Sequence, residues 1–167
     1  LQIPATELAA VAIDTGAGSL TIQGKEGVET ISVTADIYTT EKLKDEYELT
    51  LEQSNGKAYL VAKHHSTSGF WSGESPRIDL VVTMPARLLL NVEDGSGDLS
   101  ITGINASVSV IDGSGNIVIS HLNGDLNIDD GSGHIELSDV KGQVDIEDNS
   151  GDVTVNKITG YVAIDDG

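Results

Sequence analysis

Apolar residues in the second half of the chain recur with a period of 18 residues. Cutting residues 92–167 at this period aligns five apolar columns. The columns are Val92, Val110, Ile128, Ile146 and Ile164; Leu99, Ile117, Ile135 and Val153; Ile101, Ile119, Leu137 and Val155; Ile104, Leu122, Val140 and Ile158; and Val108, Leu126, Val144 and Val162. Self-similarity of this kind predicts a stack of equivalent structural repeats.

Within each repeat the apolar positions alternate with polar ones, as at Leu99 and Ile101 and again at Val108 and Val110. Alternation with period 2 is typical of strands, so each repeat should hold two strands of about five residues joined by two corners. Stacking the repeats at about 4.8 Å pairs the backbone of each with the repeats above and below. We predict an all-β, single-domain β-solenoid with 18-residue turns, an aliphatic interior and right-handed crossovers.

Glycines mark the corners of the predicted repeats. The first turn position holds Gly95, Gly113, Gly131 and then Asn149; the second holds Gly97, Gly115, Gly133 and Gly151; and the opposite corner holds Ala106, Gly124, Gly142 and Gly160. Asn tolerates positive φ better than most residues, so Asn149 predicts a left-handed backbone at the first position.

The first half of the chain contains one displaced copy of the repeat, at residues 11–24, which aligns Ile13 with Val92 and Leu20 with Leu99. The rest of residues 1–91 does not repeat and predicts longer strands, at residues 29–38, 46–53, 57–64, 77–84 and 87–92. The Asn55-Gly56 pair between two of them predicts a hairpin. We assign residues 1–167 to one domain, irregular over 1–91 and regular over 92–167.

Composition narrows the class of protein. The net charge is −18, and residues 92–167 alone carry 15 acidic residues against two lysines. Such a surface repels phosphates and anionic lipids, which excludes nucleic acid as a partner. The chain has no cysteine and no run of 18 apolar residues, so the sequence predicts no transmembrane segment. It opens without Met, as a chain processed after export or otherwise trimmed would.

The segment "IDLVVTMPARLLLNVE", followed by units such as "DGSGDLSI", resembles the bacterial "putative adhesin" family of β-strand-repeat domains. The resemblance covers roughly residues 11–167 and is strongest over 78–167. It implies a β-solenoid in an exported protein, whether periplasmic, cell-surface or extracellular, with no agreed catalytic residues to transfer. We therefore expect a non-catalytic structural or adhesin-like module with an unknown protein or glycan partner.

An aspartate column is the sharpest candidate site. It consists of Asp94, Asp112, Asp130, Asp148 and Asp166, each 18 residues apart. Stacked carboxylates repel one another, and calcium would relieve the repulsion, so an acidic calcium-binding module is the alternative function. The calcium-binding nonapeptide, however, needs Asp where this chain has Leu99 and Ile117. The favoured reading is that each Asp accepts backbone N–H groups of its own Gly-Ser-Gly corner in an Asx-turn, with weak calcium binding and no resident cofactor.

The remaining candidates are fewer. Phe70 and Trp71, in a Gly/Ser-rich segment, predict either an exposed contact for a partner or a plug for the core. The histidines have no zinc-like spacing, and no nucleophile and base are suitably placed, so a carbohydrate-active enzyme is the least favoured function. A chain ending at "AIDDG" would expose strand edges, which predicts an end-to-end homodimer or a further C-terminal segment.

Overall fold

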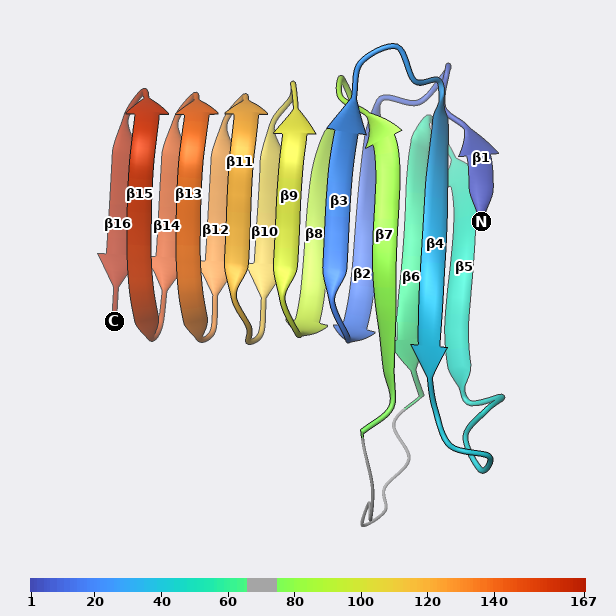
Figure 1. Ribbon diagram of the computed structural model, residues 1–167. Helices are drawn as coiled ribbons and strands as arrows, with labels where there is room; N and C mark the ends of the chain where they lie inside the picture. Colours follow the sequence, from blue (N-terminus) through green and yellow to red (C-terminus); the bar gives the residue numbers. More distant parts are fainter. Residues whose placement is uncertain (66–74) are drawn as a thin grey trace.

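The computed structural model describes residues 1–65 and 75–167, and these form an all-β protein of two eight-stranded sheets. Sheet A contains, in spatial order, β1 (Gln2–Pro4), β4 (Thr30–Tyr38), β7 (Arg77–Pro85), β3 (Leu20–Lys25), β9 (Leu99–Ile104), β11 (Ile117–Asn123), β13 (Gly133–Lys141) and β15 (Gly151–Thr159). Sheet B contains β16 (Val162–Asp166), β14 (Val144–Asp148), β12 (Leu126–Asp130), β10 (Val108–Asp112), β8 (Leu89–Ser96), β2 (Ala10–Ala17), β6 (Lys57–His64) and β5 (Tyr47–Ser54). The two sheets lie face to face (Figure 1).

From β8 onward the chain passes alternately between the sheets, and each strand pairs in parallel with the strand two places further on. The pairing partners are 18 residues apart: Val108 pairs with Leu126, Leu126 with Val144 and Val144 with Val162. The apolar columns predicted from the sequence are therefore rows of paired residues. With sheet A facing the viewer, its parallel strands run upward and the chain returns behind them toward the C-terminal end, which makes each crossover right-handed (Figure 1).

The displaced copy at residues 11–24 joins the same stack in the predicted register. Ile13 on β2 pairs with Val92 on β8, and Leu20 on β3 pairs with Leu99 on β9. Beyond them β6 and β7 still pair in parallel with β2 and β3. The pairing then becomes antiparallel, between β4 and β7, β1 and β4, and β5 and β6. The β5–β6 hairpin turns at Asn55 and Gly56, whose φ values of 52° and 74° are the pair that a type I′ turn requires.

The core lies between the sheets and is almost entirely aliphatic. Inward residues of the two regular sheets, such as Ile119 and Leu137 on sheet A and Ile128 and Ile146 on sheet B, are fully buried. Burying a side chain of this size is worth about 1.5–3 kcal/mol. The alternation of buried and exposed residues in β12, where Leu126, Ile128 and Asp130 point inward, is what the period-2 pattern predicts.

Two predictions about the repeats were wrong in part. Strands β10, β12, β14 and β16 of sheet B have the predicted five residues, but the strands of sheet A from β9 to β15 have six to nine. They are longer because a left-handed residue lies within or beside each pairing segment, at Gly103, His121, Asp139 and Lys157, with φ between 53° and 77°. This residue changes the inward spacing from two to three, so that Ile119 and Leu122 both face the core.

The second error concerns the glycine columns. Positive φ, between 133° and 151°, occurs at the second turn position, which Gly115 represents, and not at the first position that contains Asn149. We call each 18-residue passage of the chain through both sheets a coil. A Cβ atom at Gly115 would overlap the carbonyl oxygen of Gly97 in the preceding coil. Close stacking of the corners, as well as the dihedral angle, therefore requires glycine at the second position.

The part of the chain that the structure describes contains no helix with the length and apolar character to cross a membrane.

Candidate functional site

The aspartate column lies inside the molecule, at the corner where the chain passes from sheet B to sheet A. Asp112 ends β10, two residues after the inward Val110, and so points into the end of the core. Asp94, Asp112, Asp130 and Asp148 are exposed by only 5%, 3%, 0% and 3%. They are paired neighbours in the sheet, so their Cα atoms are one strand spacing apart, or about 4.8 Å. Asp166 continues the register on β16 but is exposed.

One oxygen of each buried carboxyl group is hydrogen-bonded. The backbone N–H groups of Ser114, Ser132 and Ser150 donate to Oδ1 of the aspartate two residues earlier, at 3.3, 3.1 and 3.0 Å. These bonds confirm the Asx-turn interpretation at three corners. At the fourth, the Thr15 hydroxyl donates to Asp94 Oδ1 at 2.7 Å.

Burial dominates the electrostatics of this column. It raises the pKa of Asp112 from 3.8 to about 6, with further contributions from the negative charges of Asp94 and Asp130. Burial also raises the pKa of Asp94, against the opposing effect of the Thr15 hydrogen bond, and that of Asp130. The charged form of a carboxyl group is disfavoured wherever water is removed without a compensating cation.

The residues described by the structure contain no group of three or more His, Asp or Glu side chains placed to hold a metal ion. At the position where the calcium-binding nonapeptide needs its Asp ligand, Leu99, Ile117 and Ile135 lie in the core. The aspartate column supplies one carboxyl group from each coil. A calcium ion between two adjacent coils would therefore contact two carboxyl groups, which offer fewer oxygens than the six to eight that calcium takes.

The histidines lie in separate places. His64 faces inward on β6 and packs edge-on against Tyr47, with ring centroids 5.9 Å apart, whereas His65 is exposed. His121 Nδ1 lies 2.8 Å from Asp139 Oδ2 on the next coil, at the exposed left-handed column. The hydrogen bond to His121 lowers the pKa of Asp139. The other predicted contacts, Phe70 and Trp71, lie outside the described residues.

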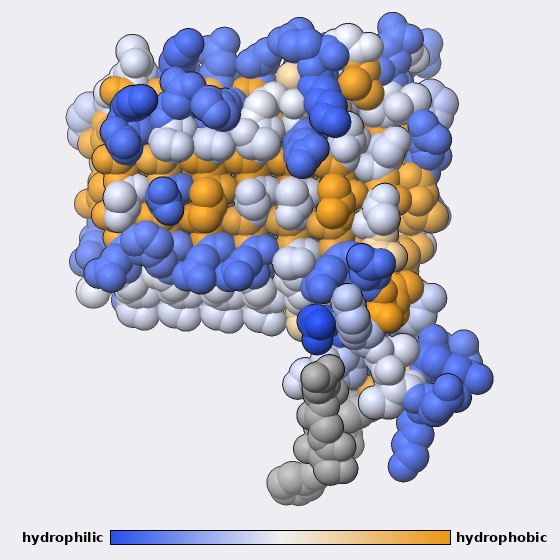
Figure 2. Space-filling view, viewed as in Figure 1, coloured by the Kyte–Doolittle hydropathy of each residue, from blue (hydrophilic) through white to orange (hydrophobic). Residues whose placement is uncertain are grey.

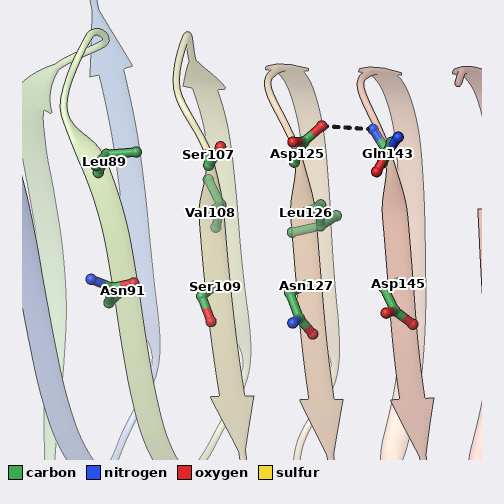
Figure 3. A pocket seen from close by; sticks show the side chains of 10 residues that line it. All are labelled: Leu89, Asn91, Ser107, Val108, Ser109, Asp125, Leu126, Asn127, Gln143 and Asp145. Carbon is green, nitrogen blue, oxygen red and sulfur yellow. Dashed lines mark hydrogen bonds between the residues drawn. The ribbon is translucent and has the colours of Figure 1, made fainter.

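The outer face of sheet B holds a groove that the sequence reasoning missed. A hollow of about 340 Å³ crosses β8, β10, β12 and β14. Its floor and walls carry two rows of side chains at right angles to the strands (Figure 3). One row is Leu89, Ser107, Asp125 and Gln143, and the other is Asn91, Ser109, Asn127 and Asp145. Asp125 Oδ1 accepts the backbone N–H of Gln143 at 2.9 Å.

A second hollow, of about 490 Å³, adjoins the first and shares Asn91 and Ser109 with it. It crosses β2, where the outward Ala12 has a short side chain, and reaches Tyr59 on β6. Tyr59 is 42% exposed, and Lys57 Nζ lies 5.6 Å from the centre of its ring. We call the two hollows together the sheet B groove. The sequence does contain a signal for this groove, because the polar positions between the apolar columns also recur every 18 residues.

The outer face of sheet A differs. Figure 2 shows a mostly apolar and weakly polar band across its middle, with hydrophilic residues along both margins. Many of its side chains are those of Ser, Thr and Val, and the Ser120 hydroxyl donates to Thr102 Oγ1 on the adjacent strand at 3.1 Å. Val81 and Val118 are 45% and 40% exposed on this face. It is a regular surface that serves as an internal comparison for the groove.

Comparison with solved structures supports the fold. A crystal structure of a "putative cell adhesion protein" from Clostridium sporogenes aligns over 99% of this chain and 96% of its own, with a TM-score of 0.58 and 15% identity. A "putative adhesin" from Parabacteroides merdae aligns over 100% and 95% of the two chains at 10% identity, with a TM-score of 0.31, which is too low to support an argument. No protein-family model matches the sequence, and neither does any curated protein. The first likeness shows that the all-β architecture of this chain occurs in a known structure.

Proposed function

We propose that this protein is a non-catalytic, adhesin-like β-solenoid module that works outside the cytoplasm and binds a glycan in the sheet B groove. The solenoid assignment is supported by the parallel pairing of residues 18 apart in both sheets. The setting and the adhesin-like role are supported by the resemblance of the repeats to the adhesin family and by the name of the C. sporogenes structure.

The observation that carries the proposal is the construction of the sheet B groove. An exposed aromatic ring, that of Tyr59, lies at one end, and amide and hydroxyl side chains, including Asn91 and Asn127, extend from it across successive strands. An aromatic face packs well against the C–H groups of a sugar ring, and amide and hydroxyl groups can both donate and accept bonds to its hydroxyls. From β6 to β14 the groove crosses five strand spacings, or about 24 Å, which suits a linear oligosaccharide.

Charge restricts the class of glycan. Exposed carboxylates line the groove or flank it on the same face, among them Glu93, Asp125, Asp129 and Asp145, while Lys57 lies at the Tyr59 end. An acidic field of this kind repels uronic acids, sulfates and phosphates. The groove therefore favours a neutral glycan.

A glycan array followed by titration of the best ligand tests the proposal. We expect Tyr59→Ala and Asn127→Ala to weaken binding by about tenfold or more, because the first removes the aromatic contact and the second removes an amide that bonds to sugar hydroxyls. Thr154→Ala, on the outer face of sheet A, serves as the matched control and should bind as the native protein does. The bound glycan should be recovered unchanged, as expected of a non-catalytic module.

Trp71→Ala belongs in the same series, because Phe70 and Trp71 are the rival interaction site from the sequence. If binding is lost in Trp71→Ala and kept in Tyr59→Ala, the groove is the wrong site. Binding of anionic glycans alone, or of a protein partner alone, would contradict the proposed ligand class.

A further inference from the structure

The buried aspartate column leaves half of its hydrogen-bonding capacity unused. Among the described residues, Oδ2 of Asp94, Asp112, Asp130 and Asp148 is buried and has no hydrogen-bond partner. Leaving a buried acceptor unpaired costs about 1–3 kcal/mol, and more if the group is charged. Four such atoms in one column need a common explanation.

Neighbouring carboxyl groups can supply that explanation. Their Cα atoms are one strand spacing, or about 4.8 Å, apart in the parallel sheet, so two carboxyl groups that face each other along the stack come within reach of a short O–H···O bond of about 2.6 Å. A proton on one Oδ2 can then be donated to the oxygen of the next coil. Two full charges at this spacing would instead repel each other strongly in surroundings that lack water.

We propose that Asp94, Asp112, Asp130 and Asp148 form a proton-sharing ladder, in which neighbouring carboxyl groups are joined by O–H···O hydrogen bonds.

The charges that act on the ladder are nearly all its own. Asp112 on β10 is flanked by Asp94 on β8 and Asp130 on β12. The charges of Asp148 on β14 and of the exposed Asp129 act on Asp130. The facing strands β9, β11 and β13 contribute the aliphatic side chains of Leu99, Ile117 and Ile135 to the core. Within residues 1–65 and 75–167, no lysine, arginine or histidine is among the groups that shift the pKa of Asp94, Asp112 or Asp130.

The β2 coil places one hydrogen donor at the end of the column. In the β2 coil the position that pairs with Asp94 is Thr15, and its hydroxyl donates to Asp94 Oδ1 while it is itself 7% exposed. A neutral donor thus stands where a further carboxylate would have added charge. The coil beyond, on β6, has Ala62 at this position and ends the column.

The ladder predicts that the protein is more stable in mild acid. Because the pKa of Asp112 is raised from 3.8 to about 6, the folded state binds its proton more tightly than the unfolded chain does. This contribution to stability is complete below pH 3.8 and is lost as the pH rises through about 6. We expect the unfolding midpoint at pH 5 to exceed that at pH 8 by roughly 5 °C.

The test combines two variants with a direct view of the protons. Asp112→Asn keeps an acceptor for Ser114 and supplies permanent N–H donors, so it should raise the midpoint at pH 8 and reduce the difference between pH 5 and pH 8. Glu147→Gln removes the same charge from an exposed position of β14 and should leave that difference unchanged. Carbon-13 NMR of the aspartate carboxyl groups in the native protein should show ladder residues that remain protonated above pH 5.

Three results would overturn the ladder. The first is that every aspartate carboxyl carbon titrates at the ordinary value of an exposed aspartate. The second is that Asp112→Asn and Glu147→Gln change the pH dependence equally. The third is that millimolar calcium raises the midpoint at pH 8 in the native protein but not in Asp112→Asn, which would assign the column to a metal ion. The NMR measurement remains decisive even if Asp112→Asn does not fold.

Discussion

At the scale of single residues, Gly115 shows what the stacking of coils demands. Its φ of 140° lies outside the range of residues with a side chain, and a Cβ atom would overlap the Gly97 carbonyl oxygen. The same two constraints recur at the equivalent glycine of each coil. The corner is therefore fixed both by the local dihedral angle and by the neighbouring coil.

We expect Gly115→Ala to lower the free energy of unfolding by about 3 kcal/mol or more, from backbone strain and the overlap together. Gly16→Ala is the matched control, since Gly16 has an ordinary φ and a Cβ there would lie 3.6 Å from Lys63. Urea denaturation followed by circular dichroism measures both. A loss in Gly115→Ala no larger than that in Gly16→Ala would contradict the account of the corner.

At the scale of strands, inward and outward residues of sheet B should contribute differently to the stability of the protein. Ile128 on β12 is fully buried, whereas Ile111 on β10 is 50% exposed. Ile128→Ala should destabilise the protein by about 2–5 kcal/mol, because it leaves a cavity in a closely packed core. Ile111→Ala removes the same atoms from the surface and should change stability by less than about 1 kcal/mol. Similar losses from both substitutions would mean that the inward register is wrong.

Much of the strand arrangement could be predicted from the sequence, because a period of 18 fixes which residues pair. The register of Val108 with Leu126 follows from it directly, and that of Ile13 with Val92 follows from the alignment of the displaced copy at residues 11–24. The left-handed column at His121 and Asp139 could have been recognised from the three-residue step between Ile119 and Leu122. The glycine error arose because the sequence reports which residues tolerate a conformation, whereas the overlap with the preceding coil is visible only in three dimensions.

The candidate sites were less predictable. The aspartate column and its Asx-turns were identified, but the burial of the four carboxyl groups depends on the corner folding inward, which no single repeat reveals. The sheet B groove joins Tyr59 from the irregular half of the chain to Asn127 from the regular half. Only the pairing order of β6, β2 and β8 brings these distant segments onto one face.

At the scale of the whole molecule, order should decrease from the middle of the stack toward its antiparallel end. Strands β8, β10 and β12 have partners on both sides, while β1 and β5 are edge strands whose side chains are exposed or only partly buried. Amide hydrogen exchange read by mass spectrometry should therefore be slowest in β8, β10 and β12 and fastest in β1 and β5. Uniform exchange across all of these strands would instead indicate that the described residues open as a single cooperative unit.

Because the register of the coils is constant, the length of the molecule can change only in units of one complete coil without disturbing the strands. Adding or removing one complete coil would lengthen or shorten both sheets by about 4.8 Å, extend the groove and the aspartate column by one rung, and leave every inward residue in place. A deletion one residue short of a coil would turn a strand over and expose its apolar side. Changes in the length of this protein should consequently be tolerated in whole coils, so that its reach can vary while its chemistry stays the same.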